Sequence, residues 1–251
     1  MKIAIIISKK DPASLNIASK LDEKKIKYYS IDKKSINCEN IDKEIKADLF
    51  IFPTKHESKS GINCLSTHSP GNFGKAELGG KNKTLCIAPE NYLKKAMIEL
   101  EKRKIKGFEV IQEVTHHGPY LEKPCMFIEI GSNKEAWSNK KAGKIIADVI
   151  GLLLKWKPEK YITAIGIGGL HHTPNFKKII INTNIALGHI CPKYNLKNLN
   201  KNMIKQMIKK NINKPNLILL DWKGLGTEKQ KIKEILKEFK IEIKRTKGIK
   251  N

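Results

Sequence analysis

The stretch EVTHHGPYLEKPCMFIEIGS, residues 113–132, decides how the rest of the chain can be arranged. It joins two short apolar runs, 108–114 and 125–130, through a turn that contains Gly118, Pro119 and Pro124. Apolar runs of this length between glycine and proline residues are typical of buried strands. The stretch therefore predicts two neighbouring strands with a short connection.

Both runs lead into side chains that can carry chemistry. The first leads to His116 and His117, and the second ends at Glu129 and Gly131. Residues 132–135, SNKE, fit a capping box, with Ser132 at the start of a helix that continues at helical spacing to about residue 153. Histidines, a carboxylate and a helix N-terminus are expected to converge at the carboxyl ends of strands, where an open α/β sheet usually has its site.

Elsewhere the chain alternates between strand and helix patterns, which indicates an α/β fold. Strands are expected at 2–8, 28–31, 47–53, 83–88, 161–166, 216–220 and 241–244, and helices at 12–24, 89–100, 199–209 and 228–239. Residues 61–83 are rich in glycine and are expected to form a long, structured and functional loop. No repeat and no linker divides the chain, so residues 1–251 are expected to form a single domain.

The composition favours a polyanionic partner. The formal net charge is +24, with 49 basic residues against 25 acidic ones. A bias toward AT-rich codons also enriches lysine, but it should raise glutamate as well. Only Arg103 and Arg245 are arginines, so lysine contacts to phosphates are expected rather than bidentate reading of bases. Sequence-independent binding to a nucleic-acid backbone is the better interpretation.

The same composition indicates a cytoplasmic protein. No apolar run approaches the roughly 18 residues of a membrane-spanning helix, and the N-terminal run is typical of a strand rather than a signal peptide. Five cysteines without a CxxC pair indicate a reducing compartment. No heptad or exposed apolar stripe requires an oligomer, so a monomer or weak dimer is expected.

The seven histidines share one kind of position. All lie in polar segments that follow predicted strands: His56, His68, His116, His117, His171, His172 and His189. A single histidine is usually structural, but seven in such positions favour a convergent site, where imidazole can bind Zn²⁺, act as a base or hold a phosphate. Neighbours in an extended strand point to opposite sides, so at most one of each adjacent pair is expected to face the site.

Other residues that could belong to the site also have an ordinary structural explanation. Glu129 and Asp221 each end an apolar strand, where a carboxylate is costly unless it is paired, and a lysine could pair with either. Gly168 and Gly169 resemble a phosphate-binding turn, but no GxGxxG pattern is complete. Cys125 is expected to be a buried thiol.

Several motifs occur in order along nearly the whole chain: HESKSG at 56–61, THSPGN at 67–72, THHGP at 115–119, FIEIGS at 127–132, GIGGLH at 166–171, GHICPKY at 188–194 and LDWKG at 220–224. Together they resemble the archaeal and plant type of D-aminoacyl-tRNA deacylase. One departure is His172, where an aromatic residue such as tyrosine is expected. It does not affect the other motifs.

The resemblance implies a zinc-dependent enzyme that hydrolyses the ester between a D-amino acid and the 3′ end of tRNA. It also implies a mixed sheet flanked by helices, a phosphorylase/hydrolase-like fold similar to that of bacterial peptidyl-tRNA hydrolase. D-aminoacyl-tRNA is then the expected partner. A peptidyl-tRNA hydrolase-like enzyme, another zinc hydrolase and a non-catalytic tRNA-binding protein are the alternatives.

The residues and the resemblance together give three sets of candidates. The catalytic candidates are Glu57, His116, Glu129 and His171. The candidates for binding the substrate, including amides that could hold an oxyanion, are His56, His68, Asn72, Gly131, Ser132, Gly168 and Gly169. The candidates for binding Zn²⁺ are His116, His117, Glu129, His171 and His189.

Overall fold

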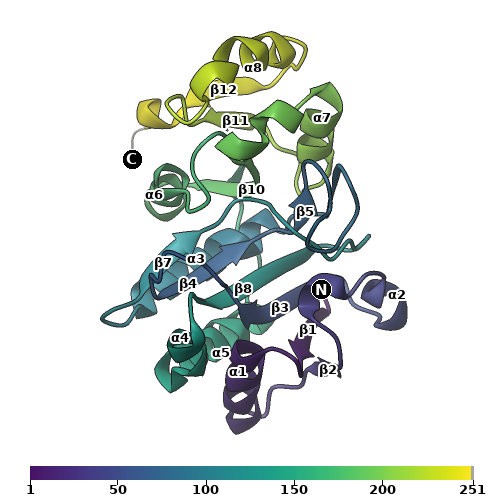
Figure 1. Cartoon of the computed structure of the whole chain (residues 1–251), viewed down its shortest axis with the longest axis vertical. Helices are drawn as coiled ribbons and strands as arrows, with labels where there is room; N and C mark the ends of the chain where they lie inside the picture. Colours follow the sequence, from purple (N-terminus) through teal and green to yellow (C-terminus); the bar gives the residue numbers. More distant parts are fainter. Residues whose placement is uncertain (250–251) are drawn as a thin grey trace.

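A computed structural model describes residues 1–249, which form two main sheets and one two-stranded sheet, with helices packed around the main sheets (Figure 1). The larger sheet has the strand order β2-β1-β3-β8-β4-β7. The first four of these strands are parallel, whereas β4 and β7 run in the opposite direction. Their bounds are β1 Ile3–Ser8, β2 Tyr29–Ile31, β3 Leu49–Lys55, β4 Cys64–His68, β7 Glu109–Gln112 and β8 Cys125–Gly131. The expected mixed α/β architecture is confirmed.

The two faces of the larger sheet are covered differently. Alternation along β8 places Met126, Ile128 and Ile130 in the core under the helices, and Cys125 and Phe127 in a separate core on the opposite face. The helices that contribute to the first core are α1 Pro12–Glu23, α3 Glu90–Arg103, α4 Lys134–Ser138, α5 Lys140–Lys155 and α6 Pro174–Asn182. The short elements beside the second core are η1 Ser35–Asn37 and α2 Ile41–Glu44. The second core covers only part of its face.

The smaller sheet is entirely parallel, with the order β10-β9-β11-β12. Ile5 of β1 and Leu219 of β11 belong to the same hydrophobic cluster, so one core extends between the two sheets. The elements of this part are β9 Ile162–Ile167, α6 Pro174–Asn182, β10 Ile185–Cys191, η2 Lys193–Asn198, α7 Lys201–Lys209, β11 Leu217–Leu220, η3 Gly226–Glu228, α8 Lys229–Leu236, β12 Glu242–Arg245 and η4 Thr246–Gly248.

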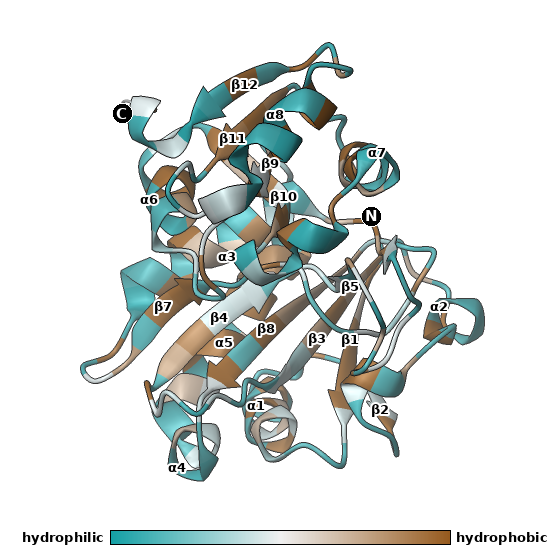
Figure 2. Cartoon of the chain, turned by 45° about the horizontal axis from the view of Figure 1, so that its top comes forward, coloured by the Kyte–Doolittle hydropathy of each residue, from teal (hydrophilic) through white to brown (hydrophobic). Residues whose placement is uncertain are grey.

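Both β4 and β10 Ile185–Cys191 were missing from the strands predicted from the sequence. Residues 61–83 were expected to form a loop, but they contain β4, which lies between β8 and β7 in the larger sheet. Its first two residues, Cys64 and Leu65, are hydrophobic and its last three are polar, and its ribbon is paler than that of β8 in Figure 2. The rest of the stretch includes β5 Gly71–Asn72, which pairs with β6 Thr84–Leu85, so the strand expected at 83–88 is much shorter.

The helix after β8 also differs from the prediction. Asn133, rather than Ser132, caps α4 by accepting a hydrogen bond from the amide of Ala136. Asn139 then caps α5 through the amides of Lys141 and Ala142, so the expected single helix is divided in two. Among residues 1–249, no helix is both long and apolar enough to cross a membrane.

Candidate active site

Glu129 lies in the middle of the larger sheet on its partly covered face. Its side chain points to the same face of the sheet as that of Phe127, two residues earlier in β8. Its neighbours on the two adjacent strands are Thr54 and Ser66. Thr54 Oγ1 donates a hydrogen bond of 2.6 Å to Glu129 Oε1. Burial and the nearby charge of Glu113 raise the pKa of Glu129 well above its usual value. The carboxylate is therefore held by a fixed donor within the sheet.

Glu113 is the centre of the polar cluster, and the sequence analysis did not single it out. It follows β7 and is buried, and its Oε2 lies 2.8 Å from His171 Nε2, 3.1 Å from His56 Nδ1 and 3.7 Å from His116 Nε2. Burial raises the pKa of Glu113, but the bonds to His171 and His56 outweigh burial and hold it well below the usual value. A carboxylate inside the apolar run 108–114 was the available signal, as it was for Glu129.

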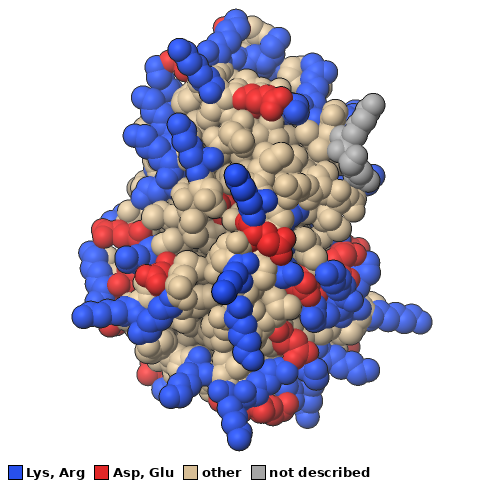
Figure 3. All heavy atoms as spheres, turned by 180° about the vertical axis from the view of Figure 1, so that it is seen from behind, with Lys and Arg blue, Asp and Glu red and all other residues tan. Residues whose placement is uncertain are grey.

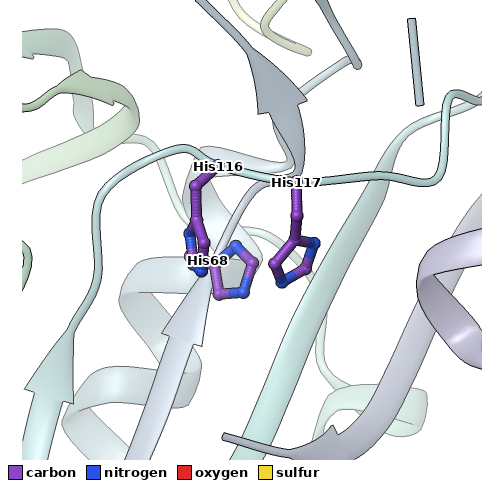
Figure 4. A group of neighbouring side chains, drawn as sticks. All are labelled: His68, His116 and His117. Atoms are coloured by element: carbon purple, nitrogen blue, oxygen red, sulfur yellow. The ribbon is translucent and has the colours of Figure 1, made fainter. Parts of the chain in front are cut away.

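Three histidines form a second group beside this carboxylate. One ring nitrogen each of His68, His116 and His117 lies within 4.8 Å of the others. Figure 4 shows His116 and His117 extending from one loop toward His68. Both members of this adjacent pair enter the group, which contradicts the expectation of at most one. The reason is the left-handed backbone of His117, with φ of 44°, because the alternation rule holds only for extended chain.

The three rings are oriented by the same kind of bond. Their Nδ1 atoms lie 3.3, 2.9 and 2.6 Å from the backbone carbonyl oxygens of Ser69, Val114 and Gly118, respectively. A carbonyl oxygen can only accept, so each Nδ1 carries the proton and each Nε2 presents a lone pair. This second bond is typical of metal-ligating histidines. The group could therefore hold a metal ion.

The protonation of these histidines fits that arrangement. Burial, followed by the neighbouring His117, lowers the pKa of His68 to about 3, and burial lowers the pKa of His117 to about 4. Burial and the neighbouring His117 also lower the pKa of His116 well below its usual value. The neutral ring is the form that binds a metal ion. His56 differs, because the hydrogen bond and charge of Glu113 outweigh its burial and raise its pKa.

Three buried polar atoms of the cluster have no hydrogen-bond partner among residues 1–249. They are His56 Nε2, His68 Nε2 and Glu113 Oε1. An unsatisfied buried polar group costs about 1–3 kcal/mol, so native proteins rarely keep several of them together. Glu129 Oε2, at 3.7 Å from His68 Nε2 and 3.8 Å from His56 Nδ1, joins the same group. These unsatisfied atoms therefore indicate that the cluster binds a further group.

The structure does not bring every predicted site residue into this cluster. His189 lies in β10, and both of its ring nitrogens make hydrogen bonds within the protein. Neither nitrogen is therefore free to bind a metal ion. Glu57 is exposed and pairs with Lys55 at 2.5 Å. The Gly168 amide donates to the carbonyl oxygen of Cys191, so it is not free to hold an oxyanion.

The remaining candidates lie at the border of the site. Gly131 packs under the ring of His56, where a Cβ atom would come within 2.7 Å of the ring, and the Ser132 hydroxyl is buried beside it without a hydrogen-bond partner among residues 1–249. Gly169 packs against Gly224. The Asn72 side chain donates a hydrogen bond of 2.9 Å to the carbonyl oxygen of Gly79 and lines a hollow next to His116 and His117.

The location of the cluster differs from the expected one. It was predicted at the carboxyl edge of parallel strands, but β4 and β7 are antiparallel to β8 and place His68 beside Phe127. The functional side chains therefore gather over the face of the sheet. His68 is the last residue of β4 and Glu113 follows β7, so both lie at strand ends, but these strands run opposite to β8. Alternation along β4 and β8 then places His68 and Glu129 on the same face.

Comparison with known proteins gives a consistent result. A family model described as D-aminoacyl-tRNA deacylase matches residues 43–244. The chain is 35% identical to the D-aminoacyl-tRNA deacylase of Pyrococcus furiosus and 36% identical to that of Pyrococcus abyssi, over 96% of this chain and 98% of each relative. A crystal structure of a conserved protein of unknown function matches with a TM-score of 0.91 at 25% identity, covering 98% of this chain and 95% of that one.

Proposed function

The chain belongs to the D-aminoacyl-tRNA deacylase family, and we propose that its histidine–carboxylate cluster hydrolyses the ester between a D-amino acid and the 3′ end of tRNA. The observation that supports this assignment is the group of open polar atoms over the face of β8: His56 Nε2, His68 Nε2 and Glu113 Oε1. Buried donors and acceptors that lack protein partners are what a hydrolytic centre offers to a water molecule and a carbonyl group.

The donor set also fits Zn²⁺. Three neutral imidazoles with their Nδ1 protons fixed by carbonyl groups match the ligand type and the supporting bonds of catalytic zinc sites. We assign His68, His116 and His117 as the residues that would hold the ion. When bound there, Zn²⁺ supplies a Lewis acid and a water ligand with a pKa near ~7.

The other residues of the cluster have separate roles in this proposal. Glu129, held by Thr54, faces His68 and His56 and takes a proton from the attacking water. His56 is favoured in its charged form by Glu113, so its open Nε2–H can donate to the ester oxygen as negative charge develops. Glu113 orients His56 and His171.

The reaction balances without a further reactant. Water adds to the ester carbonyl, the bond to the ribose oxygen breaks, and that oxygen receives the proton taken from water. The products are a D-amino acid and free tRNA. Glu129 is the group that carries the proton between these two oxygens.

The surface charge suits such a substrate. Lysine side chains are spread over the face shown in Figure 3, with fewer acidic ones between them. Lysine contacts phosphates as a point charge, which positions a nucleic acid without reading its sequence. A reaction on aminoacyl-tRNA places the protein where translation occurs, and we expect the cytoplasm.

The test is deacylation of D-Tyr-tRNA and L-Tyr-tRNA by the purified protein, with and without a chelator. Selective cleavage of the D-ester that the chelator abolishes and Zn²⁺ restores is the expected result. Selective cleavage that is insensitive to the chelator would remove the metal from the proposal and retain the carboxylates. A lack of cleavage of either ester would contradict the proposed function.

A further inference from the structure

Two hollows meet at the histidine cluster. One has a volume of about 640 Å³ and the other about 480 Å³. They share four lining residues: Leu78, His116, His117 and His171. The carbonyl oxygen of Leu78 accepts a hydrogen bond of 2.9 Å from the Gly118 amide, which ties the dividing loop to the histidine pair. The cluster therefore forms a wall between two separate spaces.

The larger space, which we call the amide hollow, has one carboxylate in its lining, the exposed Glu77, and is otherwise lined mainly by neutral amides, a phenol and lysines: Asn72, Lys75, Tyr194, Asn195, Lys197 and Asn198. Asn198 Nδ2 donates a hydrogen bond of 3.0 Å to Asn195 Oδ1. This bond leaves the Asn195 amide nitrogen as a donor and the Asn198 carbonyl oxygen as an acceptor, the two kinds of group that the edge of a base can hydrogen-bond.

Tyr194 adds a surface on which a base can stack. Its side chain is 52% exposed, while its hydroxyl lies 3.1 Å from His171 Nδ1, so the ring is fixed at the edge of the cluster. Exposed aromatic rings beside lysines are the usual platform for unpaired bases and their phosphates. Lys75 and Lys197 are both exposed in this hollow. Its chemistry is that of a nucleotide site.

The smaller space, which we call the carboxylate hollow, has a different lining: Asp11, Ser35, Ile36, Glu57, Glu129 and Trp137. The Ser35 hydroxyl is buried and has no hydrogen-bond partner among residues 1–249. Lys55 is engaged by Glu57 and lies over the ring of Trp137, and Lys10 and Lys34 are exposed at the rim. Asp11 accepts hydrogen bonds from the amides of Ser14 and Lys55, and Glu57 pairs with Lys55. Glu129 and the Ser35 hydroxyl, next to apolar side chains, are the polar groups that suit an amino group and an amino-acid side chain.

We propose that the amide hollow holds the 3′-terminal nucleotide of the tRNA and that the carboxylate hollow holds the aminoacyl group. This assignment rests on the proposed deacylase function, because the substrate of that reaction has two unlike parts joined by one ester. With one part on each side of the histidine wall, the ester lies at the open atoms of the cluster. The carboxylate hollow then determines which amino acids are accepted.

The test compares two substrates, D-Tyr-tRNA and D-Ala-tRNA, on variants of each hollow. The Asn195→Ala, Asn198→Ala double variant should lower kcat/KM about tenfold for both substrates, because it removes the hydrogen bonds that the two side-chain amides can make to the terminal nucleotide. The Ile36→Trp variant fills part of the carboxylate hollow and should lower kcat/KM for D-Tyr-tRNA at least about tenfold more than for D-Ala-tRNA, as the larger side chain is excluded. Leu154→Trp is the matched control, because it adds the same ring at an exposed position of α5 that lines neither hollow, and it should leave the ratio of the two rates near that of the wild type.

Three results would overturn the assignment. The first is a ratio of kcat/KM for D-Tyr-tRNA to that for D-Ala-tRNA that changes in the Asn195→Ala, Asn198→Ala variant and stays unchanged in Ile36→Trp. This result would assign the amino acid to the amide hollow and the nucleotide to the carboxylate hollow. Unchanged rates in both variants would remove both hollows from substrate binding. An equal loss of both substrates in Ile36→Trp, with a wild-type melting temperature, would remove the amino acid from the carboxylate hollow.

Two further controls separate the causes of failure. If Ile36→Trp does not fold, Lys34→Trp places the same ring at the exposed rim of the hollow and should produce the same change in ratio. Failure of the proposed function would appear in the wild-type protein as a lack of cleavage of D-Tyr-tRNA. The two failures are therefore distinguishable in one set of assays.

Discussion

Two histidines, His68 in the cluster and His189 in β10, are alike in their burial and in the lowering of their pKa values. Both side chains are 0% exposed, and burial lowers the pKa of His68 to about 3 and that of His189 to about 4. They differ in their hydrogen bonds. His68 uses Nδ1 only, whereas His189 Nε2 donates to the carbonyl oxygens of Cys86 and Lys210.

The second nitrogen of His189 is occupied as well. Thr115 Oγ1 lies 3.1 Å from His189 Nδ1 and accepts a hydrogen bond from the amide of Ile190. His189 therefore fastens β10 to the segments around Cys86 and Lys210, and its ring is fully satisfied. The comparison shows that an open ring nitrogen, rather than burial or a lowered pKa, separates a functional histidine from a structural one.

The largest expected effect comes from removing an open histidine. His116→Ala should lower kcat/KM for D-Tyr-tRNA by on the order of a thousandfold, since it removes one proposed zinc ligand. Bound zinc, measured on the purified protein, should fall in parallel. The free energy of unfolding of the metal-free protein should change by less than about 1 kcal/mol, because His116 is partly exposed. Full activity with full zinc content would remove His116 from the site.

Removing the satisfied histidine should have the opposite pattern. His189→Leu leaves the carbonyl oxygens of Cys86 and Lys210 without their donor, so the free energy of unfolding should fall by about 3 kcal/mol. Urea denaturation of the metal-free protein measures this change. Zinc content and KM of the folded fraction should match those of the wild type. Loss of zinc without loss of stability would contradict the structural role assigned to His189.

A third change tests what Glu113 does for the cluster. Glu113→Gln keeps the shape of the side chain but removes the charge that His171 and His56 contact. Loss of a supporting carboxylate usually costs roughly 10–100-fold in metal affinity or activity, and we expect a loss of this size in kcat/KM. The pH profile should shift as well, because Glu113 raises the pKa of His56. A loss in rate without a shift in the profile would indicate a purely structural role.

The sequence predicted the buried strands well because their composition follows from their burial. Apolar runs correspond to β1, β3 and β8 within one or two residues at their ends. β4 was not predicted, because its polar residues Ser66 and His68 face the site rather than the core. The same chemistry that makes the strand functional removes the hydrophobic signal by which a strand is recognised.

The site was predicted in its residue types better than in its geometry. The histidines of the cluster were all candidates, but the sequence could not show that His117 adopts a left-handed backbone and thereby joins His116. Nor could it separate His189, because its hydrogen bonds come from Cys86 and Lys210, which are distant along the chain. Glu113 escaped notice because its partners also come from other segments.

The smallest expected effect is the contribution of His189 to the pH dependence of the free energy of unfolding. Its pKa is about 4 in the folded protein, against an ordinary value of 6.5, so the unfolded chain binds the proton more strongly between these pH values. Stability is present above about pH 6.5 and falls as the pH falls toward 4. Between pH 7 and pH 5 this histidine alone should cost the metal-free protein about 2 kcal/mol.

The measurement is the free energy of unfolding at both pH values for the wild type and for His189→Leu. The other buried histidines lose stability in the same direction in both proteins, so they cancel in the difference between the two. The variant should therefore lose about 2 kcal/mol less than the wild type over this interval. Equal losses would mean that His189 is not buried in a neutral, fully bonded state, and the distinction between the two classes of histidine would fail.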